Sequence, residues 1–281
     1  MQQITSIADS TYNSLQVRAV RRYANGLEFL AGYTWSKSID DASQLFSTAV
    51  DPGFPQNSNN LRAERALSDF DARHRFVASY VYQEPSLAGR SRFAANPVVS
   101  ALLSHWTVGG TGTVQTGRPF TVNRSVLQSM TGIQAYIDRP DQVSDPTKPG
   151  PVMANADPTC YKTVSEGGRA ADVTHTPASW FNPCAFSNPN LLGEIRFGTA
   201  PRNSVIGPGY VDFDVSVMRS QRIAEKSTLQ LRADLFNGFN HPNFDVPDRI
   251  FDSPTFGSLI SANAYGNRPP RQLQLGVRYS F

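Results

Sequence analysis

The sequence contains no apolar segment long enough to form a transmembrane helix. Its longest apolar run, residues 97–103, falls well short of the roughly 18 residues that a spanning helix needs. Charged residues are also scarce, at 17% of the chain against roughly 25% in typical soluble domains. Aromatic residues, by contrast, are plentiful, with 17 Phe and 10 Tyr. This imbalance favours a sheet that faces something other than water.

The chain also lacks the charge bias of a nucleic-acid-binding protein and the signature of a secretory leader. Its 26 basic and 23 acidic residues are spread along the chain, so we expect no nucleic-acid partner. Residues 1–10 contain neither a basic cluster nor an apolar core. If the protein is exported, we expect its leader to lie upstream of Met1.

Recognisable catalytic and metal-binding motifs are missing. The histidines are scattered, and none pairs with another at a metal or catalytic spacing; they are His74, His105, His175 and His241. No Gly-x-Ser-x-Gly, His-Glu-x-x-His or Gly-x-x-x-x-Gly-Lys segment occurs. Residues 109–112 are rich in glycine but lie within an alternating segment, where small residues ease curvature. We therefore predict no enzyme, no catalytic residue, no metal site and no cofactor.

Close carboxylates are the remaining candidates for site chemistry. Asp40 with Asp41, Asp69 with Asp71, and Asp212 with Asp214 are compatible with calcium binding in loops, but the simpler expectation is solvated or arginine-paired acids. A second group is expected to make ion pairs at the pore wall or mouth, and it comprises Glu64, Arg65, Asp71, Arg73 and Arg75. No ligand-binding residue can be named from these patterns.

What the sequence does contain is repeated alternation of apolar and polar residues, the pattern of strands with one apolar face. Several of these segments have about ten residues, the length that a tilted membrane strand requires. The clearest is the last, where Leu273, Leu275, Val277, Tyr279 and Phe281 alternate with polar residues and glycine. In all, seven strands are expected, at residues 15–19, 27–35, 75–82, 106–115, 211–217, 228–235 and 271–281.

The connections between these strands alternate in length. Asn25-Gly26 predicts a tight hairpin, because both positions accept positive φ. Residues 220–226 predict another short turn, whereas the second, fourth and sixth connections have roughly 35, 90 and 30 residues. Up-and-down barrels of the outer membrane have short periplasmic turns and long extracellular loops. The third connection, residues 83–105, is long for a periplasmic turn.

Alternation without a spanning helix indicates a membrane barrel, because every backbone polar group inside hydrocarbon must be paired within the protein. The fold class we predict is all-β, an antiparallel up-and-down transmembrane barrel with outer-membrane lipid around it. Aromatic residues near strand ends are expected at the lipid interface: Tyr33, Trp35, Tyr80, Tyr82, Trp106, Tyr279 and Phe281. The alternative is a soluble β-sandwich, whose strands also alternate. Loop-length parity and the terminal aromatic residue favour the barrel.

Seven strands do not make a single-chain bacterial barrel, whose strand number is even. We therefore expect residues 1–281 to be the C-terminal portion of a larger barrel. The two cysteines, Cys160 and Cys184, lie in a polar loop. Outside the outer membrane, in an oxidising environment, they can close a disulfide worth about 3 kcal/mol. Two free thiols are the alternative.

Several motifs resemble those of TonB-dependent receptors of the Oar-like group, and together they cover nearly the whole chain. They are Tyr12-Asn13-Ser14-Leu15-Gln16, Asn25-Gly26-Leu27, residues 33–41, residues 70–76, residues 116–120, Trp180-Phe181-Asn182-Pro183, residues 202–209 and residues 236–244. The resemblance implies an outer-membrane barrel of about 22 strands around an N-terminal plug. It also implies energy supplied through TonB by the inner-membrane proton-motive force.

The resemblance gives the function that we expect. The parent protein would be an active transporter or receptor for a large or scarce ligand, with partners in the TonB system reached through an N-terminal region, plug and strands absent from this chain. The closing strand, Leu273 to Phe281, is similar to the segment read by the barrel-assembly machinery. The alternative is an outer-membrane scaffold or adhesion barrel whose loops bind an external partner without transport.

Overall fold

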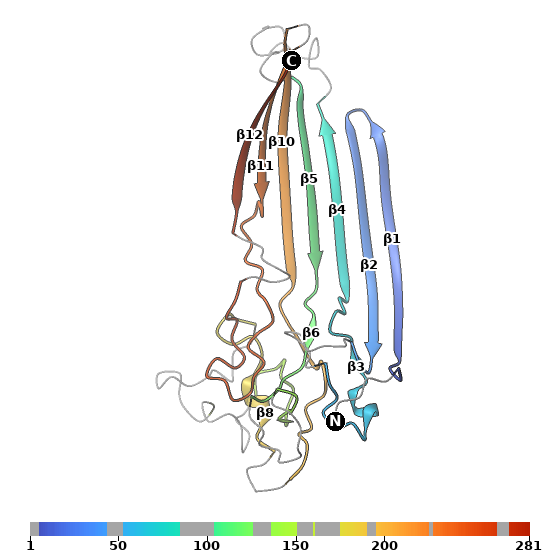
Figure 1. The fold of residues 1–281 in the computed structure, drawn as a ribbon, viewed down its shortest axis with the longest axis vertical. Coiled ribbons are helices and arrows are strands. Elements are labelled where there is room, and N and C mark those ends of the chain that lie inside the picture. Colours follow the sequence, from blue (N-terminus) through green and yellow to red (C-terminus); the bar gives the residue numbers. More distant parts are fainter. Residues whose placement is uncertain are drawn as a thin grey trace.

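The computed structural model describes residues 6–43, 53–84, 104–125, 136–150, 160, 175–189, 195–224, 227–262 and 270–281. Seven long antiparallel strands form one sheet, in the order β1-β2-β4-β5-β10-β11-β12 (Figure 1). They are β1 (Ser10–Ala24), β2 (Leu27–Asp40), β4 (His74–Gln83), β5 (Trp106–Gln115), β10 (Tyr210–Ala224), β11 (Ser227–Phe236) and β12 (Gln272–Ser280). The two-residue strand β3 (Ala66–Leu67) pairs with the end of β2. All seven expected strands are confirmed, and so is the all-β fold class.

Four more short strands lie in the connections. β6 (Pro119–Phe120) pairs with β9 (Val205–Ile206), and β7 (Asp141–Gln142) pairs with β8 (Phe186–Ser187). Short 3-10 helices occur at η1 (Leu61–Glu64) and η5 (Pro183–Ala185). No helix in the described part of the chain is both long and apolar enough to cross a membrane.

The register between strands brings the predicted apolar positions onto a single face of the sheet. Side chains directly opposite each other on paired strands point to the same side. Leu231 faces Val277 on β12 and Arg219 on β10, and Val217 in turn faces Val108 on β5. The same alignment continues through Tyr82 on β4 to Leu27 on β2. The seven alternating stripes therefore join into one surface, which we call the apolar face.

The opposite surface, the polar face, is less uniform than the sequence predicts. It carries most of the charged strand residues, including Glu28, Asp214 and Arg278. A few apolar side chains share it, among them Val77 and Val81, which face Thr113 and Gly109 on β5. The alternation along β4 is therefore incomplete, because Val77 and Val81 occupy positions on the polar face.

Glycines on β5 leave room for aromatic rings on the apolar face. A Cβ at Gly112 would lie 2.5 Å from the Phe213 ring, and one at Gly110 would lie 2.8 Å from the Tyr80 ring. Rings from the two neighbouring strands thus cover the glycine backbone. The sequence alone suggested that these glycines ease curvature, whereas the structure shows that they make space for neighbouring side chains.

No second layer covers the apolar face in the described part of the chain. Leu275 and Val277 are each 73% exposed, and Leu15, Val17 and Trp35 are at least half exposed. A β-sandwich would bury these residues against a second sheet. The sheet is open, with β1 and β12 as its two edges.

The shorter connections lie at one end of the sheet and the longer ones at the other, as the sequence predicted (Figure 1). The β1–β2 and β10–β11 hairpins, the ends of β4 and β5 that the third connection joins, and the C-terminus all lie at one end, the short-turn end. Asn25 and Gly26 have φ values of 52° and 82°, which the tight hairpin requires. The β10–β11 turn is shorter than predicted, because β10 continues to Ala224 and β11 begins at Ser227. Residues 225–226 of this turn lie outside the described residues. The same is true of most of the predicted connection 83–105 and of part of the predicted loop 131–203.

The two faces should respond oppositely to a charged substitution. Val217→Arg places a guanidinium in the middle of the apolar face, where it should cost about 2–4 kcal/mol in a bilayer. Ser216→Arg, one residue away on the polar face, should be tolerated. The measurement is the amount of heat-modifiable folded protein in isolated outer membranes. Equal assembly of the two variants would contradict the assignment of the faces.

Candidate functional site

The three long connections meet at the other end of the sheet and form what we call the loop body. It comprises the described parts of residues 41–73, 116–209 and 237–271, and Figure 1 shows these segments gathered below the strands. Loops at the mouth of a scaffold are where binding residues concentrate. The loop body is therefore the candidate functional site.

Unlike the sheet, the loop body has a buried apolar core. Its members come from the connections that follow β5 and β11: Phe120, Val122, Phe181, Ala185, Phe186, Ala200, Val205, Phe251 and Phe256. The Phe181 ring is central, with its centroid 5.8 Å from Phe120, 5.9 Å from Phe186 and 5.1 Å from Phe256. These edge-on and tilted contacts are the favoured geometries for aromatic pairs. Two segments distant in sequence are thus fixed in one arrangement.

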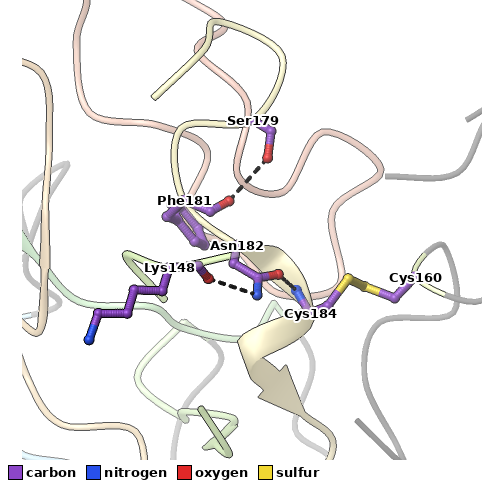
Figure 2. Close-up of a disulfide and its surroundings, with 6 residues drawn as sticks. All are labelled: Lys148, Cys160, Ser179, Phe181, Asn182 and Cys184. Atoms are coloured by element: carbon purple, nitrogen blue, oxygen red, sulfur yellow. Dashed lines mark hydrogen bonds between the residues drawn. A yellow bond between two sulfur atoms is a disulfide. The ribbon is translucent and has the colours of Figure 1, made fainter. Parts of the chain in front are cut away.

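A disulfide joins Cys160 to Cys184 beside this core, as Figure 2 shows. Their Cα atoms are 5.8 Å apart, within the range that a disulfide spans. Asn182 begins the 3-10 turn that holds Cys184: its Oδ1 accepts the Cys184 N–H at 2.9 Å, and its Nδ2 donates to the Lys148 carbonyl at 3.2 Å (Figure 2). The Trp180-Phe181-Asn182-Pro183 motif therefore supplies one core residue and one turn-capping residue. Trp180 adds a hydrogen bond from its Nε1 to the Ile206 carbonyl at 2.8 Å.

Two other sequence motifs pack directly on each other. A Cβ at Gly117 would lie 1.8 Å from the Gly207 carbonyl oxygen, so only glycine fits there. Asn203 has a φ of 50°, in the left-handed region that asparagine tolerates. Its Nδ2 donates to the Leu67 carbonyl at 2.7 Å, and its Oδ1 accepts from Thr121 Oγ1 at 2.9 Å. Asn203 thereby joins the connection after β2 to the one after β5.

Three asparagines in the motif that follows β11 replace backbone pairing at the strand end. Asn243 accepts the Val211 N–H at 2.8 Å and donates to the Val211 carbonyl at 2.9 Å. Its side-chain amide thus pairs with the backbone of β10 as a residue of a neighbouring strand would. Asn237 uses its side chain in the same way on the backbone of His241, at 2.9 and 3.0 Å. The Asn240 Oδ1 accepts the Arg271 N–H at 3.0 Å, just before β12. The motif leads the chain from the sheet into the loop body.

Buried ion pairs attach the first long connection to the rest of the loop body. Arg139 bonds to Glu64, and both side chains are almost completely buried. Arg202 donates to Asp40 Oδ1 at 2.8 Å, at the end of β2, and to the Glu64 carbonyl at 3.2 Å. The apolar core includes no residue of the described part of 41–73. That connection is therefore attached by charge and hydrogen bonds rather than by apolar packing.

Two further arginine–carboxylate pairs lie nearby, Arg124 with Asp138 and Arg196 with Asp141. Burial lowers the pKa of the Arg124 guanidinium, and the charges of Asp138, Asp252 and Asp141 offset part of that effect. At Asp141, burial acts to raise the pKa, but hydrogen bonds from Arg196 and Thr199 together outweigh it and leave the pKa below its usual value of 3.8. Arg196 donates from Nη1 to Asp141 Oδ1 at 2.8 Å and from Nη2 to Asp141 Oδ2 at 2.5 Å. This bidentate geometry is the strong form of the pair.

The structure gives partners to most of the charged residues singled out in the sequence, and it places Arg75 on β4 opposite Gln115. Glu64 pairs with Arg139, while Arg65 lies 3.3 Å from Asp9, at the start of β1. Asp71 accepts the Ser38 N–H at 2.7 Å. The other close carboxylates hold backbone or side-chain donors: Asp40 bonds to Arg202, Asp41 to the Asp9 N–H, Asp212 to the Tyr210 hydroxyl and Asp214 to the Asn237 N–H.

Histidines do not assemble a reactive site in the described part of the chain. His74 Nδ1 lies 2.8 Å from the Tyr33 hydroxyl, and the His175 ring packs edge-on against Trp180 at 5.1 Å. Within the same residues, no three metal-ligating side chains come together.

Sequence reasoning missed the arginines that organise the loop body. Arg124, Arg139 and Arg196 lie in irregular segments, where no periodicity marks a buried position. Arg202 belongs to a motif noted from the sequence, but its carboxylate partner is 162 residues away. Only the folded chain brings these partners together.

The Asp141–Arg196 pair should make the loop body sensitive to acid. The folded-state pKa of Asp141 lies below the unfolded value, so its stabilisation is complete above pH 3.8 and is lost as the pH falls through the lower folded-state pKa. Asp141→Asn should therefore remove part of this pH dependence. The measurement is the rate of pepsin cleavage within residues 116–209 of the full-length protein between pH 2 and 5.

Asp145→Asn is the matched control for this experiment. The pKa of Asp145 is also lowered, chiefly by hydrogen bonds from Thr147, but these lie within one exposed turn. Its loss should leave the cleavage profile of the loop body nearly unchanged. A profile of Asp141→Asn that matches the wild type would contradict the prediction.

Comparison with known proteins agrees with the one-faced sheet and its long loops. The model of the family described as outer membrane beta barrel domain matches residues 1–274, nearly the whole chain. No curated protein matches the chain. The family match agrees with the apolar face and with the alternation of short and long connections. The chain therefore belongs to the outer membrane β-barrel domain family, and its location is the outer membrane.

Proposed function

We propose that this barrel domain is part of a TonB-dependent active transporter or receptor, which takes up a ligand too large or too scarce for passive pores. The supporting observation is the loop body, a folded and disulfide-linked assembly placed at one end of a membrane sheet. Such an assembly offers a surface of fixed shape, which a receptor needs in order to recognise its ligand. Several of the motifs that resemble Oar-like receptors help to build this assembly, among them residues 180–183, 202–209 and 236–244.

The strand count supports a larger barrel. Seven long strands are an odd number, and the edges at β1 and β12 have no partner strand within the described sheet. We infer that both edges pair with strands outside this chain, and that a plug occupies the lumen and contacts TonB. In outer-membrane barrels the short turns face the periplasm, so the loop body would face outward.

The alternative function is a scaffold or adhesion barrel whose loops bind an external partner without transport. Exposed aromatic residues in the loop body, Phe70 and Tyr136, suit either function, because both need an adhesive outer surface. The two functions differ in their need for energy. Only transport requires TonB and the proton-motive force.

The uptake experiment uses cells that express the complete protein. Labelled maltodextrins, peptides and ferric chelates are supplied one class at a time, and accumulation is measured with and without functional TonB. We expect at least one class to accumulate, and to stop accumulating when TonB is inactivated or a protonophore is added. Surface binding without accumulation for every class would favour the scaffold function.

We also propose that the barrel-assembly machinery recognises β12. Its apolar residues are highly exposed along the sheet edge, and Phe281 at the C-terminus is 94% exposed. Phe281→Ala should slow the appearance of heat-modifiable protein in the outer membrane by severalfold, because the terminal ring belongs to the C-terminal segment, β12 and Phe281, that we propose is recognised. Phe239→Ala removes another exposed ring, which packs on Phe213 at the loop end, and serves as the control. Equal assembly kinetics for the two variants would contradict this proposal.

A further inference from the structure

Charged side chains on the apolar face are few and of one sign. Among the described strand residues, those whose register places them on this face include three cations, Arg21, Lys37 and Arg219, and no carboxylate. Lys37 lies toward the loop body, whereas Arg21 and Arg219 lie toward the short-turn end. The apolar band is thus bordered by positive charge on both sides.

Arg219 is held in place by contacts to its own strand and to the neighbouring one. Its guanidinium carbon lies 5.6 Å from the centroid of the Trp106 ring, the first residue of β5. Its Nη2 donates to Gln221 Oε1 at 3.3 Å on the same strand. The Trp106 ring beneath the guanidinium and the hydrogen bond to Gln221 together fix its orientation. The arginine therefore presents an oriented positive charge at the sheet surface.

The surroundings of Arg219 are apolar on the side toward the middle of the sheet. Val217 is the next residue on the same face of β10, and Leu231 stands opposite Arg219 on β11. Val108 and Val277 continue this surface on β5 and β12. A ligand that fits the whole patch must therefore combine an anionic group with hydrocarbon. A phospholipid has both, with the phosphate beside the arginine and the acyl chains along the valines and leucine.

We propose that Arg219 and Trp106 form a binding site for the phosphate of a phospholipid in the leaflet at the short-turn end. The guanidinium binds the phosphate through charge-assisted hydrogen bonds, for which its planar donor geometry is suited. Trp106 supports the guanidinium and occupies the interface, where tryptophan is enriched. The site fixes the height of the sheet in the membrane at this strand. It does not depend on the proposed transport function.

The test measures lipids bound to the complete protein extracted from outer membranes into detergent. Native mass spectrometry counts the bound phosphatidylglycerol for the wild type, Arg219→Gln and Arg222→Gln. Arg222 is the matched control, because it lies three residues away but faces Thr228 on the polar face. Arg219→Gln should weaken retention of phosphatidylglycerol by roughly tenfold, the scale of one lost hydrogen bond to a charged group. Arg222→Gln should retain the lipid as the wild type does.

Two comparisons on the wild-type protein keep the proposal testable if Arg219→Gln does not assemble. Diacylglycerol with the same acyl chains lacks the phosphate and should not be retained. Millimolar inorganic phosphate carries the charge without the chains and should not displace bound phosphatidylglycerol. Equal retention of diacylglycerol, full displacement by inorganic phosphate, or equal losses in the Arg219 and Arg222 variants would each overturn the proposal.

Discussion

The structure depends on one constraint: the hydrogen-bonded register between neighbouring strands. Because side chains alternate along a strand, a slip of one residue would move a whole apolar stripe to the other face. From β1 to β12 the observed register keeps every stripe on the same side. The result is a surface matched to hydrocarbon, in which the backbone polar groups of neighbouring strands satisfy each other.

The sheet and the loop body are stabilised in different ways. The sheet has no buried core of its own in the described residues, so its apolar face needs lipid. The loop body does have such a core, centred on Phe181, together with a disulfide and buried ion pairs. With this division the strands can adapt to the bilayer while the loop body keeps its shape in water.

The attachment of the first long connection differs from the rest of the loop body. Arg139 with Glu64 and Arg202 with Asp40 are buried pairs, which cost desolvation and gain little net stability over apolar packing. Such pairs favour one geometry strongly, because leaving either charge alone and buried is expensive. They specify where residues 53–73 sit, whereas the aromatic core stabilises the two later connections.

The sequence by itself determined the strands, the two faces and the sorting of short and long connections, because a period of two residues and turn-forming pairs such as Asn25-Gly26 are local signals. It also marked the motifs, although not their roles. Only the tertiary structure decided that Gly117 must pack against Gly207, that Arg202 finds Asp40, and that Arg219 stacks on Trp106. These partners lie far apart in the chain, and no local pattern encodes which distant segment will meet another. Their pairing follows from strand register and from the packing of the loops.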